Sequence, residues 1–508
     1  MSDASVSAAL RSLARLVVIE SPAGCGKTFQ GAQYASETAE KIGDRRVLIL
    51  AHTHAACDVF ASRTRGVDGR VDIRTIDSLI GEIAGVYHQS LSLPPDTGVW
   101  AQSQKDGYGQ LAAKVAGLLR ASPMIARSLV QRYPVVICDE HQDASADQHA
   151  VVMACYEGGA SVRIFGDPMQ RIFGGKKKSV KVETDERRWE DLKLKANLLE
   201  ELNEPHRWLN DSEPLGRWIL RAREALRSGS PIDLRSSLPL GVSIIAAENQ
   251  SPRRGGYQLS DGEGRQIRDL VKTTNSLLVL AAYNDTVNAL RSFFGRRLPI
   301  WEGHMRDSLT TLVDEVRRQT GDAPRIAKAL IAFVGDVAKG FSLSAYGNRL
   351  LDEIAKGCVA KCTGKPATLQ VLGKLIIDQP DHKGVAKFLH RLMELIKTDP
   401  AFRAVELDCP HELWDAIRLG QFDNMDDGIA EISHRRTHSR PAPPAKAIST
   451  VHKAKGLECD NVLIMPCDAQ HFGDTTAARS LLYVAMSRAK CSLTFVVSRE
   501  NPSPLILL

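Results

Sequence analysis

The sequence predicts an α/β protein with two parallel-sheet domains, each carrying a largely helical insertion. Short apolar runs alternate with helical patterns in two separate regions of the 508 residues. Strands that alternate with helices pair in parallel, and parallel sheets bind ligands beyond the carboxyl ends of their strands. Polar turns and chemically active side chains follow the ends of these runs. The intervening residues 301–436 have amphipathic helical patterns and little sign of strands.

Each expected strand is a short apolar run between turn signals. In the first region the expected strands are residues 16–20, 47–51, 71–75, 135–138 and 162–165. In the second region they are residues 277–281, 447–450, 462–465 and 493–497. We therefore expect a first domain at 1–80 and 133–203, with a small helical insertion at 81–132. The second domain is expected at 204–300 and 441–508, with a helical insertion at 301–440.

The composition excludes several classes of protein. With 43% hydrophobic residues the chain is globular, and no apolar run approaches the ~18 residues of a membrane helix. Residues 1–15 lack a continuous apolar core, so no cleaved signal is expected. The ten cysteines are scattered, which favours reduced thiols in a cytoplasmic protein without a zinc site. The net charge of +6 is compatible with a polyanionic partner but does not establish one.

A candidate phosphate-binding loop follows the first expected strand directly. Its sequence is Ser21-Pro22-Ala23-Gly24-Cys25-Gly26-Lys27-Thr28. Such a turn points backbone N–H groups into one concavity, where the N-terminus of the following helix adds partial positive charge. Lys27 can then reach the β- and γ-phosphates of a nucleoside triphosphate, and the Thr28 hydroxyl can bind Mg²⁺. Ser21 stands where the general pattern has its first glycine, and a plain Gly-rich turn is the alternative interpretation.

Two adjacent carboxylates follow the expected strand at 135–138. A phosphate loop needs a carboxylate to hold Mg²⁺, and Asp139 fits that need. The neighbouring Glu140 can orient and deprotonate an attacking water molecule. An exposed acidic turn would be the simpler explanation if these residues stood alone. Their position after a phosphate loop and a buried strand favours catalysis.

Arg488 lies on an otherwise apolar helical stripe. Leu481, Val484 and Ala485 precede it at helical spacing, so the guanidinium is on the core-facing side. A charge in that position is costly unless an anion meets it. A triphosphate would supply the anion, and an internal salt bridge is the alternative.

The order of these blocks resembles that of the superfamily 1 helicases of the UvrD/Rep/PcrA type. The blocks are the phosphate loop and residues 139–143, 165–170, 450–458 and 481–490. The resemblance covers both α/β regions, and unrelated phosphate-loop proteins lack the later blocks. It implies two RecA-like motor domains with ATP and Mg²⁺ bound in the cleft between them.

The resemblance also implies roles for individual residues. Lys27, Thr28 and Asp139 would bind the phosphates and Mg²⁺, and Glu140 would activate water. Gln170 would sense the γ-phosphate, and Glu458 would contact the ribose of the nucleotide.

Further residues would complete the nucleotide site, and two arginines among them would come from the second motor domain. Residues 204–207 stand where the family has Asn-Tyr-Arg, which makes Arg207 one arginine finger and Arg488 the other. His206 replaces the tyrosine that stacks on adenine. Phe29 stands where an arginine is common, and both rings can still stack on a base. No glutamine precedes the loop, so the preference for ATP over GTP stays open.

The family's DNA track would lie across the same domains. The matching positions are Thr53, His54, Thr75, Phe173 and His452. Asp77 stands where histidine is usual, and Gly175 stands where the family has a base-stacking tryptophan. Because a stacked aromatic is worth about 1–3 kcal/mol per base, we expect a weaker grip on single strands or altered stepping.

We therefore expect a DNA-dependent ATPase that moves on single-stranded or partly duplex DNA, with 3′ to 5′ polarity by resemblance. The main alternative is a DNA- or nucleotide-sensing ATPase subunit that regulates a partner nuclease and unwinds little. In size and layout the chain resembles the short UvrD-like helicase subunit of Gabija-type antiviral systems. A nucleotide-binding structural component without hydrolysis is a further alternative, which Glu140 and the two arginines disfavour. No membrane partner is expected.

Overall fold

The computed structural model divides the chain into two compact units. One unit comprises Met1–Phe293 with Thr450–Leu508, and the other comprises Phe294–Ser449. The structure describes residues 2–67, 69–104, 106–173, 180–210, 212–248, 257, 259, 261–295, 297–301, 307–407, 410–438 and 444–508. None of the helices in these ranges has the length and apolar character needed to cross a membrane.

The first unit contains a six-stranded, parallel sheet in the order β3-β2-β4-β5-β1-β6. Its strands are β1 (Leu16–Glu20), β2 (Val47–Ala51), β3 (Val71–Thr75), β4 (Val135–Cys138), β5 (Ser161–Gly166) and β6 (Leu198–Glu201). Strands β1, β2 and β4 are buried along their whole length, as their apolar runs predict.

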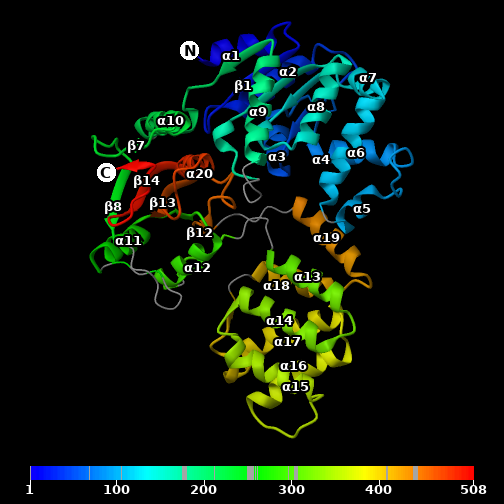
Figure 1. The fold of residues 1–508 in the computed structure, drawn as a ribbon, viewed down its shortest axis with the longest axis vertical. Coiled ribbons are helices and arrows are strands. Elements are labelled where there is room, and N and C mark those ends of the chain that lie inside the picture. Colours follow the sequence, from blue (N-terminus) through cyan, green and yellow to red (C-terminus); the bar gives the residue numbers. More distant parts are fainter. Residues whose placement is uncertain are drawn as a thin grey trace. The chain divides into compact units, whose positions relative to one another are not determined.

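Helices cover both faces of this sheet (Figure 1). Val17 and Ile19 belong to a core shared with α1 (Ser2–Arg11), α2 (Lys27–Ala39) and α3 (His54–Arg63). Leu16 and Val18 belong to the core on the opposite face. That core is shared with α4 (Ile76–Val86), α5 (Thr97–Ser103), α6 (Gly107–Ala121), α7 (Pro123–Arg132), α8 (Ala146–Gly158) and α9 (Val180–Lys195). Successive residues of β1 thus contribute to opposite cores, as expected for a strand that is buried on both faces of its sheet.

The second sheet is five-stranded, in the order β12-β9-β13-β14-β8. Its strands are β8 (Val242–Ala247), β9 (Leu277–Ala281), β12 (Lys446–Thr450), β13 (Cys459–Cys467) and β14 (Ala489–Ser498). The pairs of β13 with β9 and β14, and of β14 with β8, are parallel. The helices that belong with it are α10 (Glu213–Arg227), α11 (Asp261–Thr273), α12 (Asn284–Phe293) and α20 (Thr476–Met486).

We call the six-stranded sheet with its helices the first lobe, and the five-stranded sheet with α10, α11, α12 and α20 the second lobe. Both lobes lie in the first compact unit, apart from residues 446–449 of β12. The α/β class with parallel sheets is confirmed. Helix α10 packs against α20, and a short parallel pair joins β7 (Ile232–Asp233) to β15 (Ile506–Leu507).

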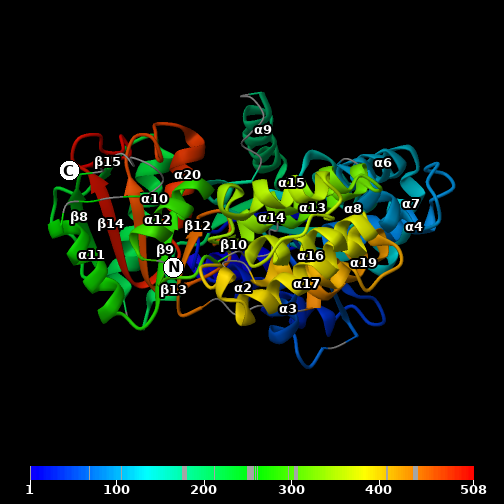
Figure 2. The same cartoon turned by 90° about the horizontal axis from the view of Figure 1, so that it is seen from below.

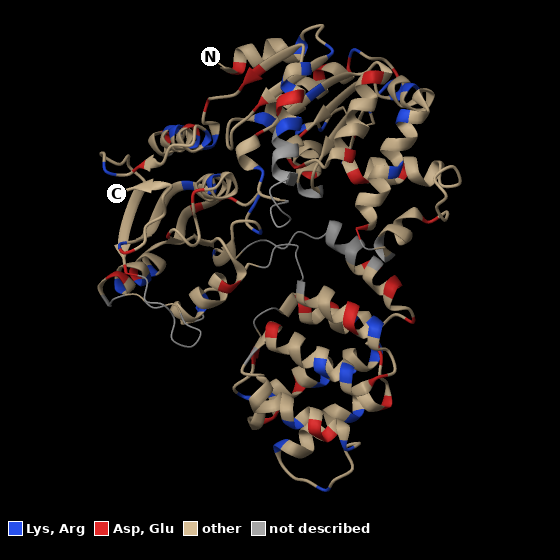
Figure 3. Cartoon of the chain, viewed as in Figure 1, with Lys and Arg blue, Asp and Glu red and all other residues tan. Residues whose placement is uncertain are grey.

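The second unit is a helical bundle with its own apolar core. Its helices are α13 (Asp307–Gln319), α14 (Ala323–Val337), α15 (Asn348–Ala355), α16 (Lys365–Asp378), α17 (His382–Thr398), α18 (Pro410–Leu419) and α19 (Met425–His438). Figure 2 shows α14, α16 and α17 side by side, and β10 (Ala338–Lys339) pairs with β11 (Glu406–Leu407). Residues of both charge signs are interspersed along these helices (Figure 3).

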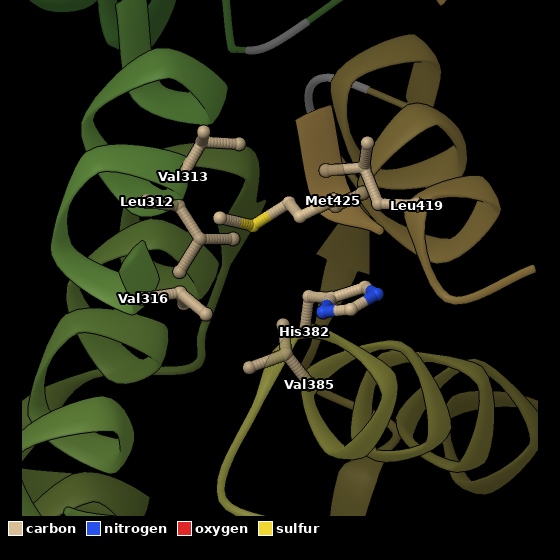
Figure 4. Close-up of a pocket in the computed structure, with 8 residues that line it drawn as sticks. Leu312, Val313, Val316, His382, Val385, Leu419 and Met425 are labelled. Atoms are coloured by element: carbon tan, nitrogen blue, oxygen red, sulfur yellow. The ribbon is translucent and has the colours of Figure 1, made fainter. Parts of the chain in front are cut away.

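A small pocket lies between the helices of this bundle (Figure 4). It is lined by Leu312, Val313, Val316, His382, Val385, Ala416, Leu419 and Met425. Apart from His382, whose Nε2 lies 3.0 Å from the carbonyl oxygen of Phe422, the lining is apolar. The pocket therefore has the character of a packing gap inside the core.

Candidate nucleotide site

The phosphate loop connects β1 to α2 at the carboxyl edge of the first sheet. Gly24 and Gly26 have φ values of +77° and +82°, in the left-handed region that favours glycine. Among the described residues, the amide N–H groups of Gly24, Gly26, Lys27 and Thr28 have no hydrogen-bond partner. The Ser21 hydroxyl is also buried without a partner. A concavity of unpaired donors at a helix N-terminus fits the oxygens of a phosphate chain.

Strand β4 places Asp139 and Glu140 beside this loop. The N–H of Asp139 donates to Leu50 O at 2.9 Å, which extends the ladder between β2 and β4 by one residue. Lys27 Nζ lies 3.8 Å from Asp139 Oδ1 and forms a close ion pair with Glu140 Oε1. Glu140 has a φ of +51°, which is uncommon for a residue other than glycine. This left-handed backbone turns its side chain away from the strand direction and toward Lys27.

The electrostatics of Lys27 and Asp139 reflect burial and mutual attraction. Burial lowers the pKa of Lys27, and the Asp139 carboxylate opposes that shift. Burial likewise raises the pKa of Asp139, against the effect of Lys27. Asp139 is a buried carboxylate next to the phosphate loop, and such an oxygen donor suits Mg²⁺, which also takes phosphate and water ligands. The roles of Thr28 and Asp139 as ligands of the ion stay predictions.

Residues 206–208 lie directly on the phosphate loop as a short 3₁₀ turn, η3 (His206–Trp208). The N–H of Arg207 donates to Gly24 O at 3.1 Å. A Cβ atom at Gly24 would be 2.7 Å from Trp208 Cζ3, and one at Gly26 would be 3.0 Å from His206 Cδ2. Both glycines are therefore required by this close approach as well as by their φ angles. Trp208 Nε1 donates to Ala489 O at 2.7 Å, so the same turn is fixed to the second lobe.

The side chain of Arg207 crosses to the second lobe. Its Nη1 donates to Ser487 O at 2.6 Å, and its Nη2 donates to Glu458 Oε1 at 2.5 Å. The structure thus brings Arg207, Glu458 and the loop at Gly24 together, as the sequence predicts for neighbours around one nucleotide.

Arg488 lies at the end of α20 and is 3% exposed. Its donors reach Val484 O at 3.0 Å, Leu457 O at 3.3 Å and Ser487 Oγ at 2.8 Å, all in the second lobe. Burial, reinforced by the positive charge of Arg207, lowers the pKa of Arg488 to about 10. A buried arginine that is bonded mainly to carbonyl oxygens has a strong electrostatic preference for an incoming anion.

His206 and Phe29 are the two residues predicted to stack on the base. His206 Nε2 lies 2.6 Å from Asp3 Oδ2 of α1. Phe29 is 57% exposed, and the Arg63 guanidinium carbon lies 5.9 Å from the centre of its ring. Both rings have a charged neighbour, and the ring of Phe29 is largely open to solvent.

Gln170 connects the loop region to the second lobe through contacts that the sequence did not reveal. Its side chain donates to Asp167 Oδ2 at 3.0 Å, and its carbonyl oxygen accepts from Lys455 Nζ at 2.8 Å. Lys455 also forms an ion pair with Asp143, and both side chains are nearly buried. Lys455 belongs to the block at residues 450–458, three residues before Glu458. The lysines of this block were the only indication in the sequence that it carries a positive charge to the site.

The predicted DNA-binding positions fall into two groups. Thr53 and Thr75 are helix N-caps, since their hydroxyls accept from Ala56 N at 3.2 Å and Ser78 N at 3.1 Å. Phe173 and His452 lie together, with ring centres 6.1 Å apart, and Lys455 Nζ is 5.0 Å from the Phe173 ring. His54 begins α3, but its side chain lies outside the described residues, as does Gly175.

Arg223 of α10 is a buried arginine that sequence reasoning missed. It is on the apolar side of α10, with Ile219 four residues before it and Leu226 three residues after it. This is the same signal that singled out Arg488, and it was available in the sequence. Its guanidinium reaches Glu20 and Asp167 at the carboxyl edge of the first sheet.

Comparison with known families fits this arrangement. Residues 3–172 match the AAA domain family, and residues 447–496 match the UvrD-like helicase C-terminal domain family. The first match contains the phosphate loop with Asp139 and Glu140, and the second contains Glu458 and Arg488. No curated protein matches the chain.

Two parallel-sheet lobes that share a phosphate loop define a nucleotide-binding protein of the helicase and ATPase class. Within that class the two matches support assignment to the UvrD-like superfamily 1 helicases, as the sequence blocks predicted.

Proposed function

We propose that this protein is an ATP-driven motor that moves along single-stranded DNA. The observation that carries the proposal is that one phosphate loop is contacted by elements of both lobes. Arg207 bonds to Gly24 through its backbone and to Glu458 through its side chain, and Tyr483 of α20 bonds to Ala23. A ligand held in the loop therefore has the second lobe within reach of its phosphates.

Glu140 is the candidate base for hydrolysis. Lys27 donates to its Oε1, and Gln142 Nε2 donates to its Oε2 at 2.5 Å, so both oxygens have donors. The oxygens of a bound triphosphate compete for the ammonium group of Lys27. Once Lys27 moves to phosphate, Oε1 is available to orient a water molecule and accept its proton. Mg²⁺ held by Thr28 and Asp139 would neutralise charge on the β- and γ-phosphate oxygens.

Arg207 and Arg488 are the candidate arginine fingers. Arg488 lies in the second lobe, whereas Arg207 lies on the phosphate loop and its side chain is bonded to the second lobe. Each guanidinium is held by oxygen atoms that a phosphate anion can replace. Their attraction to the γ-phosphate would draw the lobes together, and hydrolysis would release that attraction. Alternation between the two states would move the protein along a strand, with 3′ to 5′ polarity by resemblance.

Phe173, His452 and Lys455 are the candidate strand-binding group. An aromatic ring that is 38% exposed beside an imidazole and an ammonium group suits the stacking of a base. Lys455 also contacts Gln170, so the same residue lies between the strand-binding group and the candidate γ-phosphate sensor. This contact offers a physical route from nucleotide state to the grip on DNA.

The test is ATP hydrolysis by the purified chain with and without single-stranded DNA. We expect stimulation by DNA, and we expect Arg488→Ala to lose about 10³-fold or more in turnover while nucleotide binding persists. Turnover that ignores DNA would contradict the motor. Tailed duplexes of both polarities then measure unwinding, and hydrolysis without unwinding would favour the sensory subunit of a nuclease complex.

A further inference from the structure

Arg223 lies among carboxylates at the carboxyl edge of the first sheet, although its helix packs in the second lobe. Helix α10 contacts α20 and β14, both of the second lobe. Arg223 Nη2 lies 2.7 Å from Glu20 Oε1 and 2.8 Å from Asp167 Oδ1, and Nε lies 3.2 Å from the same Asp167 oxygen. Glu20 ends β1 and Asp167 follows β5, so one guanidinium joins the ends of two neighbouring strands.

Burial makes these contacts strong and geometrically demanding. Arg223 and Asp167 are 0% exposed, and Glu20 is 7% exposed. Burial alone would lower the pKa of Arg223, but Asp167, Tyr483 and Glu20 raise it above its ordinary value, so the group stays charged. The planar fork of a guanidinium matches two carboxylates in a way that an ammonium group does not. The position of α10 is therefore tied to the position of Asp167.

Asp167 in turn is bonded to the catalytic candidates. Its Oδ2 accepts from Gln170 Nε2 at 3.0 Å, and its backbone N–H donates to Gln142 Oε1 at 3.1 Å. Gln142 Nε2 then donates to Glu140 Oε2. A Cβ atom at Gly166 would clash with Trp189 Cη2 and lie 3.0 Å from Gln142 Oε1, so the residue before Asp167 is closely surrounded. The route from Arg223 to Glu140 consists of consecutive hydrogen bonds between buried or half-buried groups.

We infer that Arg223 is a positioning residue that couples helix α10 of the second lobe to Glu140, acting through Asp167 and Gln142. The inference rests on the proposed ATP hydrolysis and adds a second link between the lobes, separate from the arginine fingers. Movement of α10 changes where Asp167 holds Gln142, and Gln142 determines where Glu140 Oε2 points. An error of about 1 Å in the position of a catalytic group can cost 10²-fold in rate.

The experiment compares Arg223→Lys, Gln142→Met and the double variant with the parent protein. Lysine keeps the charge, so the carboxylates retain a partner, whereas removal of a buried ionic partner would risk unfolding. Arg227→Gln is the matched control, because Arg227 is on the same helix and lies 3.0 Å from Glu20 but is not bonded to Asp167. Melting temperature, affinity for a fluorescent ATP analogue and kcat are measured for each variant.

We expect Arg223→Lys and Gln142→Met each to lower kcat about 10- to 100-fold, with nucleotide affinity within about twofold of the parent. The double variant should be no slower than the slower single variant, because both changes break one route. Arg227→Gln should keep the parental kcat. Parental turnover in Arg223→Lys, or losses that multiply in the double variant, would overturn the inference. If the parent itself does not hydrolyse ATP, it is the proposed function that fails.

If Arg223→Lys does not fold, Gln142→Met decides the question, because it leaves the ion cluster intact. Its kcat should fall as stated, because the Gln142 side chain no longer donates to Glu140 Oε2. An unchanged kcat in folded Gln142→Met shows that no such route reaches Glu140.

Discussion

The hydroxyl of Tyr483 accepts a hydrogen bond from the backbone N–H of Ala23 at 2.8 Å. Tyr483 belongs to α20 in the second lobe, and Ala23 belongs to the phosphate loop in the first. Burial raises the pKa of Tyr483 well above its ordinary value, so the hydroxyl stays neutral. Because Arg488 follows at the end of the same helix, this hydrogen bond sets the distance between α20 and the loop.

We expect Tyr483→Phe to weaken nucleotide binding about 2- to 10-fold, because the loss of one hydrogen bond costs about 0.5–1.5 kcal/mol. The ring volume is kept, so packing should change little. A titration with a fluorescent ATP analogue measures the effect. Tyr156→Phe on α8 is the matched control and should bind as the parent does. Equal affinities in Tyr483→Phe and the parent would show that α20 does not shape the loop.

The ion pair of Lys27 with Glu140 leads to a prediction about hydrolysis. Glu140→Gln keeps the size of the side chain but removes the base, so kcat should fall about 10²- to 10⁴-fold. Nucleotide affinity should stay the same or increase, since Lys27 no longer has Glu140 as a competing partner. Single-turnover hydrolysis and equilibrium binding separate the two effects. Substantial turnover in Glu140→Gln would mean that another group activates the water.

The interior of the fold was well predicted because its signals are local. Strands β1, β2, β3, β4 and β9 begin and end where the apolar runs predict. Strands β6 and β8 were missed, and both are at sheet edges. The residues of β6 are alternately half-buried and exposed, and two of its four residues are the charged Glu200 and Glu201. An edge strand needs no continuous apolar run, so it leaves a weaker pattern.

The candidate site also has one part that the sequence predicts and one part that it does not. The phosphate loop could be predicted because its donors are consecutive in the sequence. The contacts of Lys455 with Asp143 and of Arg223 with Asp167 could not, because each pairs residues far apart in the chain. The apolar stripe of α10 indicates that Arg223 is buried, but it does not identify the carboxylate that the guanidinium contacts. The tertiary fold alone supplies that partner.

His141 and His149 predict acid sensitivity. His141 Nε2 lies 2.9 Å from His149 Nδ1 beside Arg188, and burial lowers the pKa of His149 to about 4 and that of His141 well below its ordinary value. Between pH 6.5 and 4 the unfolded chain therefore binds protons that the folded chain does not. The free energy of unfolding falls as the pH falls through this window, by about 1.4 kcal/mol per pH unit for each histidine.

The measurement is urea unfolding at pH 7.5, 6.0 and 5.0 for the parent and His149→Gln. Glutamine cannot take up a proton and can still bond to His141, so the variant should lose less stability between pH 6.5 and 5. His390→Gln is the control, because His390 is an exposed residue of the helical unit. Parallel curves for the parent and His149→Gln would assign the acid sensitivity to other groups.

Phe173 leads to a prediction about DNA. Its ring has His452 and Lys455 as neighbours and is partly open to solvent, so a base can stack on it. Phe173→Ala should weaken single-stranded DNA binding by about 1–3 kcal/mol, which is roughly 5- to 150-fold in Kd. Fluorescence anisotropy with a labelled oligonucleotide measures this loss.

The control for Phe173 is Leu194→Ala, which removes another exposed apolar side chain and should leave DNA affinity unchanged. ATP affinity without DNA should equal that of the parent in both variants, because Phe173 does not contact the phosphate loop in the described part of the chain. Basal ATPase should also persist in Phe173→Ala, while the DNA concentration for half-maximal stimulation should rise in proportion to Kd. If affinity falls but that concentration does not change, the DNA that Phe173 binds is not the DNA that stimulates hydrolysis. The strand-binding group would then lie elsewhere on the lobes.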